Sequence, residues 1–105
     1  MAYAQPTMAG MQSTELDLTP LTAVSPLDGR YAAKLKPLRS SMSEFGYMRF
    51  RVQVEIAWFM ALSDAGMPEF APLSPDARSY LAELVKGFSP EDARAIKAFE
   101  KTTNH

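Results

Sequence analysis

A short turn in this 105-residue chain holds two side chains that could bind a charged ligand, in the sequence Asp28-Gly29-Arg30-Tyr31. Asp-Gly is typical of a turn, and this turn would present Arg30 and Tyr31 from a non-helical segment. Arginine offers a forked, permanently charged donor that matches phosphate or carboxylate, and tyrosine adds a hydroxyl group on a rigid ring. Two interpretations stay open: an anion-binding turn, and an ordinary surface turn with an exposed Arg and a packed Tyr. The pattern alone favours the second.

His105 is the single histidine and the last residue of the sequence. Taken alone, it is most simply a solvated terminal side chain. Imidazole has a reference pKa near 6.5, so this side chain could also donate or accept a proton at neutral pH. A lone histidine cannot build a zinc site, which needs three or four ligands, and the chain has no cysteine. The sequence also lacks a Walker loop and a glycine-rich dinucleotide motif, so we expect no metal and no cofactor.

The composition is that of a soluble globular chain, with 47% apolar and 22% charged residues. A formal net charge of -1 gives no strong field toward nucleic acid or an anionic membrane. No apolar run approaches the roughly 18 residues that span a bilayer. Residues 1–17 contain no Lys or Arg, and a secretory signal needs a basic start. We therefore expect a cytoplasmic protein with neither a nucleic-acid nor a membrane partner.

Prolines and glycines divide the chain into segments. We interpret residues 1–18 as a flexible N-terminal extension. Residues 19–37 contain Pro20, Pro26, Gly29 and Pro37, so no regular element of any length fits there. This segment is expected to be an ordered, irregular arm, with a short helical turn over residues 31–35.

Residues 38–65 have an ambiguous hydrophobic period. Apolar and polar residues alternate over 50–58, as in a strand. A second pattern with spacings of three and four predicts a helix, and it comprises Phe45, Met48, Val52, Ile56, Phe59 and Leu62. The length decides for one long helix, because strands usually run about 3–10 residues. Gly46 is expected to mark a kink or a break, since glycine costs about 1 kcal/mol in a helix.

Two shorter helices are expected to begin at Ser74 and Ser89. Each serine is followed by proline and an acidic residue, which together form a strong N-terminal signal. In the second of these helices, Ala93, Ile96 and Phe99 are expected to face inward. The fold class is therefore all-α: an irregular N-terminal arm followed by one long and two short helices.

The long helix carries more apolar surface than two short helices can cover. The large aromatic side chains that need burial are Phe45, Tyr47, Phe50, Trp58 and Phe59. An uncovered apolar area of this size is typical of a chain that packs against further chain or other subunits.

Three stretches together resemble the bacterial type of the adenylosuccinate lyase family. They are Leu21-Thr22-Ala23-Val24-Ser25-Pro26-Leu27-Asp28-Gly29-Arg30-Tyr31, then Phe50-Arg51-Val52-Gln53-Val54-Glu55, then Lys101-Thr102-Thr103-Asn104-His105. The resemblance covers roughly residues 21–105 and about a quarter of a family member. It implies that residues 19–105 are the N-terminal helical domain of a fumarase/aspartase-type lyase, incomplete because the chain is truncated.

The resemblance implies a homotetramer whose active sites each draw on three subunits. The implied reaction eliminates fumarate from adenylosuccinate, giving AMP, and from the succinocarboxamide ribotide of purine biosynthesis. Arg30 and Tyr31 match the family's pair at the nucleotide phosphate. Asn104 and His105 match its substrate-binding pair, and the histidine is a candidate for proton transfer as well as for binding.

The sequence stops before the Asp that the family has next, before its Thr-Ser segment, and before the histidine and the serine loop proposed as acid and base. We therefore expect the chain alone to be inactive. Two other interpretations stay open: a stand-alone helical interaction module that docks its apolar helix on a protein partner, and another lyase of the fumarase/aspartase superfamily.

Overall fold

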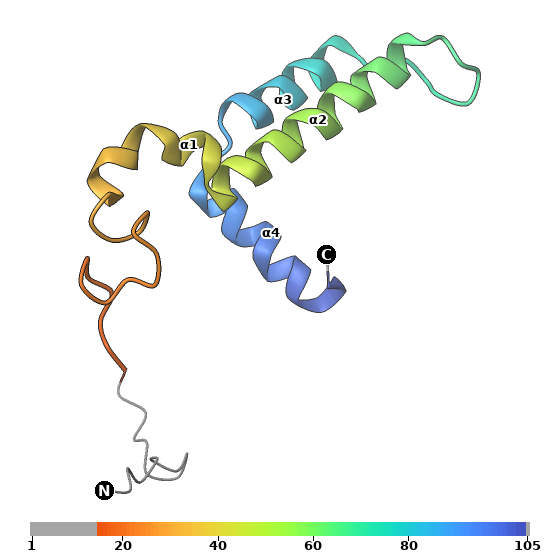
Figure 1. Cartoon of the computed structure of the whole chain (residues 1–105). Helices are drawn as coiled ribbons and strands as arrows, with labels where there is room; N and C mark the ends of the chain where they lie inside the picture. The colour runs from red at the N-terminus through yellow and green to blue at the C-terminus, as the bar shows by residue number, and fades with distance from the viewer. Residues whose placement is uncertain (1–14, 105) are drawn as a thin grey trace, which may run out of the picture. The chain divides into compact units, whose positions relative to one another are not determined.

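The computed structural model describes residues 15–104 and is helical throughout its regular parts (Figure 1). The elements are a 3-10 helix, η2, over Ala32–Leu38, followed by α1 (Arg39–Met42), α2 (Glu44–Asp64), α3 (Pro75–Lys86) and α4 (Pro90–Thr103). No strand occurs among the described residues. The all-α prediction is therefore confirmed. Of the expected extension 1–18, residues 1–14 lie outside the described part, and 15–18 have no regular secondary structure.

The chain divides into two compact units, residues 1–36 and residues 37–105. The first contains the irregular arm, in which successive turns run from Thr19 to the start of η2. The short helical turn expected at 31–35 is this 3-10 helix, which begins one residue later and extends to Leu38. The second unit holds the four α-helices.

The long helix predicted within residues 38–65 is observed as α2, and the expected break lies at Ser43, three residues before Gly46. Ser43 has an extended backbone, with φ -87° and ψ 171°, and separates α1 from α2. Its hydroxyl accepts a hydrogen bond from the Gly46 backbone N–H at 3.1 Å, which caps α2. A Cβ atom on Gly46 would lie 2.6 Å from the backbone carbonyl of Ser41. Glycine at position 46 therefore permits the bend, although the bend itself falls three residues earlier.

The starts of α3 and α4 confirm the predictions from the Ser-Pro-acid signals. The Ser74 hydroxyl accepts from the Ala77 N–H at 3.1 Å. Ser89 and Asp92 form a reciprocal capping box: the Ser89 hydroxyl accepts from the Asp92 N–H at 3.3 Å, and the Asp92 carboxylate accepts from the Ser89 N–H at 2.9 Å.

The second unit is organised around α2, which contacts α1, α3 and α4. Figure 1 shows α3 running back beside α2, and α4 crossing near the N-terminal end of α2. The Phe45 ring of α2 stacks on Phe88, in the link between α3 and α4, with ring centroids 5.6 Å apart. Met48, only 4% exposed, is the most buried large side chain of this small core. Ala93 of α4 is also buried.

Two side chains expected in the interior are exposed. Phe99 is 75% exposed, and Phe59 is 46% exposed. The reason for Phe99 is helical geometry: at about 100° per residue, Ala93, Ile96 and Glu100 share one side of α4, and Phe99 projects well away from it. Phe59 is on the same side of α2 as Met48, and helical geometry does not explain its exposure.

A second face of α2 remains uncovered in this unit. Tyr47, Phe50, Val54 and Trp58 recur at spacings of three and four, and their exposed fractions run from 43% to 65%. The expected surplus of apolar surface on the long helix is therefore confirmed.

Candidate functional site

The turn that presents Arg30 is fixed by a close backbone approach at Gly29. Gly29 is buried, and a Cβ atom there would lie 3.0 Å from the Pro20 carbonyl oxygen and 3.3 Å from the Ser25 carbonyl oxygen. The backbone N–H of Gly29 donates to the Pro26 carbonyl at 3.2 Å, and that of Tyr31 donates to the same oxygen at 3.0 Å. A Cβ atom at position 29 would force these neighbouring backbone atoms to move by a few tenths of an ångström, so the arm is tightly packed at this point.

Arg30 and Tyr31 lie together, as the sequence predicts, and Lys34 joins them. The Arg30 guanidinium carbon is 4.7 Å from the centroid of the Tyr31 ring, a cation–π distance. The Lys34 Nζ atom is 5.9 Å from the same centroid. No ion pair engages either cation within residues 15–104. Two exposed cations therefore lie against the ring of one tyrosine, a combination suited to an anion.

Lys34 is the residue of this cluster that sequence reasoning missed. It lies three residues after Tyr31, which is one turn of a 3-10 helix, and its backbone N–H donates to the Tyr31 carbonyl at 2.9 Å. If the 3-10 helix had been predicted from the sequence, its three-residue turn would have placed Lys34 beside the Tyr31 ring.

Asn104 ends α4 in the left-handed conformation, with φ 66° and ψ -5°. Asparagine tolerates this conformation better than most residues other than glycine. Its backbone N–H donates to the Glu100 carbonyl at 2.8 Å. The side chain is thereby displayed just past the helix end, at an exposed position. His105 lies outside the described residues.

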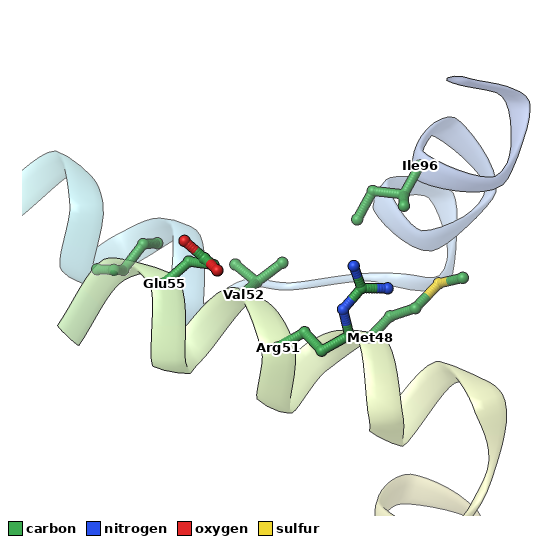
Figure 2. A pocket seen from close by; sticks show the side chains of 6 residues that line it. Met48, Arg51, Val52, Glu55 and Ile96 are labelled. Atoms are coloured by element: carbon green, nitrogen blue, oxygen red, sulfur yellow. The ribbon is translucent and has the colours of Figure 1, made fainter. Parts of the chain in front are cut away.

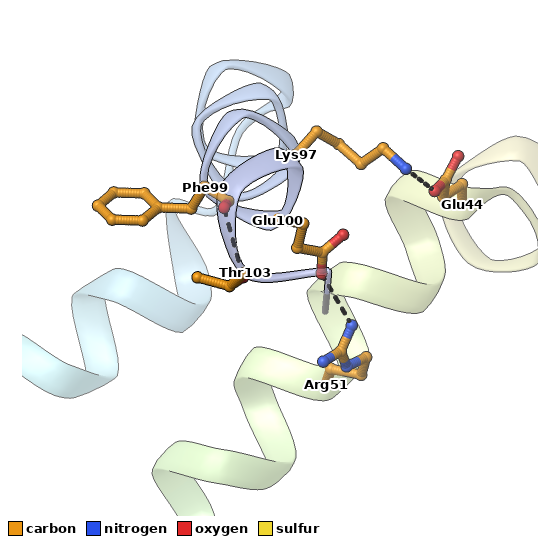
Figure 3. Close-up of polar contacts among 6 residues, drawn as sticks. All are labelled: Glu44, Arg51, Lys97, Phe99, Glu100 and Thr103. Atoms are coloured by element: carbon orange, nitrogen blue, oxygen red, sulfur yellow. Dashed lines mark hydrogen bonds and ion pairs between the residues drawn. The ribbon is translucent and has the colours of Figure 1, made fainter.

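Arg51 connects α2 to the last turn of α4. Its Nη1 atom lies 3.5 Å from the Glu100 carboxylate, and its guanidinium lies 5.5 Å from the centroid of the Tyr47 ring. Figure 3 shows this ion pair together with a second one between the same helices, Lys97 Nζ to the Glu44 carboxylate at 2.7 Å. The hydrogen bond and the charge of Glu44 raise the pKa of Lys97 above its usual value of 10.5.

A cavity between α2 and α4 is lined by Met48, Arg51, Val52, Glu55, Ile56 and Ile96 (Figure 2). Its volume is about 180 Å³, which is below the roughly 300 Å³ at which small-molecule pockets begin. The apolar floor and small size exclude it as a nucleotide site by itself. A larger hollow of about 560 Å³ lies beside the end of α4, with Arg51, Phe99, Glu100 and Thr103 in its wall.

Within residues 15–104, no helix is long and apolar enough to cross a bilayer. The same part of the chain contains no cluster of three or more His, Cys, Asp or Glu side chains that could hold a metal ion.

Comparison with curated proteins gives a consistent result. The chain is 50% identical over 91 residues to an adenylosuccinate lyase of Haemophilus influenzae and 48% identical over 91 residues to one of Escherichia coli. It is 40% identical over 97 residues to one of Dictyostelium discoideum. Over this matched stretch the chain is similar to adenylosuccinate lyases of two bacteria and of Dictyostelium discoideum. No protein-family model matches it.

The match covers 86% of this chain and 20% of the Haemophilus and Escherichia adenylosuccinate lyases. The chain thus spans about one fifth of the length of these relatives. The matched stretch is long enough to include the arm, α2 and most of the remaining helices. The resemblance that the three short sequence stretches indicated is confirmed.

Proposed function

We propose that this chain forms part of an adenylosuccinate lyase of purine biosynthesis. The reaction eliminates fumarate from adenylosuccinate, giving AMP, and from the succinocarboxamide ribotide. The sequence identity of 48–50% to two adenylosuccinate lyases is the observation that carries the proposal. A base removes a proton beside a carboxylate, a carbanion-like intermediate forms, and an acid protonates the leaving nitrogen.

In this proposal Arg30 and Tyr31 bind the nucleotide phosphate. The 4.7 Å distance between the guanidinium and the ring supports the assignment, because the stacked ring orients the guanidinium without consuming its hydrogen-bond donors. A phosphate then receives charged, directional hydrogen bonds from Arg30 and a further one from the phenol.

Asn104 and His105 contact the substrate in the same proposal. The left-handed backbone at Asn104 supports a substrate contact by this residue, since it ends the helix and leaves the amide side chain exposed. His105 binds the substrate and is a candidate for proton transfer. The base and the remaining catalytic groups are expected from segments beyond these 105 residues.

The test uses protein produced from the complete reading frame that contains these residues, with fumarate release measured from adenylosuccinate. Arg30→Ala should raise KM roughly tenfold to a hundredfold, the usual value of a hydrogen bond to a charged group. Lys36→Ala is the matched control, because Lys36 is an exposed cation of the same segment without a contact to Tyr31. An unchanged KM in Arg30→Ala would contradict the phosphate-binding role of Arg30. If the unsubstituted protein released no fumarate, the proposed function itself would be wrong.

The 105-residue chain by itself should release no fumarate. Loss of one member of a catalytic set can cost several kcal/mol of transition-state stabilisation, and here most members of the family's set lie beyond the chain. A purified chain that released fumarate in a coupled assay would contradict this.

We further propose a cytoplasmic homotetramer with a nucleotide substrate and no nucleic-acid or membrane partner. The exposed apolar face of α2, formed by Tyr47, Phe50, Val54 and Trp58, supports assembly, because a face of this kind is stabilised when another element covers it. The formal net charge of -1 gives no support to nucleic-acid binding.

A further inference from the structure

The last turn of α4 is tied to α2 through one residue, Glu100. Its carboxylate pairs with Arg51 of α2 at 3.5 Å. Its backbone carbonyl accepts the hydrogen bond of the Asn104 N–H at 2.8 Å. One residue therefore joins the body of the helical unit to the residue that ends the helix.

We propose that Arg51 and Glu100 are positioning residues that hold Asn104 in its place at the end of α4. The inference rests on the proposed function, in which Asn104 contacts the substrate. Arg51 acts through Glu100 and is not itself assigned a contact with the substrate.

The surroundings of the ion pair fit a fixed anchor. The Glu100 side chain is 24% exposed, the lowest exposure of any acidic group in the four ion pairs described. Arg51 is oriented by the Tyr47 ring, 5.5 Å from the guanidinium, on the same helix. Partial burial and a pre-oriented guanidinium reduce the entropy lost in forming the pair and the screening by solvent.

The neighbouring ion pair of the same two helices serves as a matched control. Lys97 and Glu44 also join α4 to α2, at 2.7 Å, and Figure 3 shows both pairs together. Lys97 lies nearly one turn before Glu100, and its carbonyl is not the acceptor for Asn104. If the two pairs only held α4 in place generally, breaking either would speed exchange at Asn104; under the proposal, only breaking the first pair does so.

The direct experiment is residue-resolved hydrogen–deuterium exchange on protein from the complete reading frame. In Arg51→Ala and in Glu100→Gln, exchange of the Asn104 amide should become about two- to fivefold faster, the range that a partly exposed ion pair supports. In Glu44→Gln and Lys97→Gln it should stay at the unsubstituted rate. The charge-swapped double variant, Arg51→Glu with Glu100→Arg, should restore much of the protection.

An unchanged Asn104 rate in both single variants, or an equal increase in the control variants, would overturn the proposal. Glu100→Gln keeps the shape of the side chain, so it tests the anchor even if Arg51→Ala fails to fold. Kinetics supply a second readout: both single variants should lower kcat/KM for adenylosuccinate about two- to fivefold, with rescue in the double variant. If the unsubstituted protein released no fumarate, the proposed function would fail. The positioning role of Arg51 and Glu100 would still be tested, because the exchange measurement does not depend on activity.

Discussion

The backbone carbonyl of Ser41 occupies the space where a side chain on Gly46 would begin, with a Cβ atom at Gly46 only 2.6 Å from it. This approach lets the four-residue helix α1 fold back against the first turn of α2. The neighbouring Ser40 carbonyl oxygen would lie 2.8 Å from the same Cβ position. All of these neighbours are backbone atoms, which cannot rotate away as a flexible side chain can.

Gly46→Ala should therefore destabilise the helical unit by about 1–3 kcal/mol. Helix propensity alone gives the opposite sign, since alanine in a helix is favoured over glycine by about 1 kcal/mol. Urea denaturation followed by circular dichroism decides between the two effects. A gain in the free energy of unfolding would show that α1 moves aside without cost.

Gly29→Ala should open the arm, because the added methyl group would lie 3.0 Å from the Pro20 carbonyl oxygen and 3.3 Å from that of Ser25. Trypsin cleavage after Arg30 reports on the opening, and its rate should rise roughly fivefold for each ~1 kcal/mol of local strain. Leu27→Ala is the control, because Leu27 is 60% exposed in the same turn. Equal cleavage rates for Gly29→Ala and the unsubstituted chain would contradict the tight packing at Gly29.

The Glu44–Lys97 ion pair predicts a loss of stability at alkaline pH. The pKa of Lys97 is raised in the folded state, first by the hydrogen bond from its ammonium to Glu44 and then by the charge of Glu44. The folded state therefore holds this proton more tightly than the unfolded state. The resulting stability is complete below the ordinary pKa of 10.5 and is lost as pH rises through the higher folded value.

Melting temperatures measured from pH 8 to strongly alkaline pH should check this. The unsubstituted protein should lose stability more steeply above about pH 10 than Lys97→Gln does. Lys101→Gln is the comparison, since Lys101 makes no ion pair in the described part of the chain. Parallel curves for the protein and Lys97→Gln would show that the exposed pair is fully screened.

The uncovered face of α2 predicts an assembly defect in Trp58→Lys. Trp58 is 61% exposed in the helical unit, so the substitution should leave the unit folded while placing a charge in the proposed contact with other chain or subunits. Sedimentation velocity of protein from the complete reading frame should show smaller species than the unsubstituted protein. Gln53→Lys, on a different side of the same helix, should sediment unchanged. A normal assembly in Trp58→Lys would place the contact elsewhere.

Local chemistry made the helix starts predictable. Ser74 and Ser89 are each followed by proline and acid, and all the hydrogen bonds of such a cap lie within four residues. The turn at Arg30 and Tyr31 was predictable for the same reason. Asp-Gly sets the turn, and both candidate side chains follow it directly.

The remaining features depend on how one helix packs against another. The break at Ser43 arises where α1 approaches Gly46, and no periodicity records that approach. The ion pair between Arg51 and Glu100 joins residues 49 positions apart. Phe99 is predicted to face inward with Ala93 and Ile96, whereas its exposure follows from which side of α4 meets α2.

The arrangement in which α3 and α4 both pack on α2, and not on one another, has a consequence for how this unit tolerates sequence change. Substitutions on α3, near the Arg78–Asp64 ion pair, and on α4, near Ile96, have no common neighbour through which to couple. Their energetic effects should therefore add. Each short helix is free to diverge without a compensating change in the other, provided that its own match to α2 is kept.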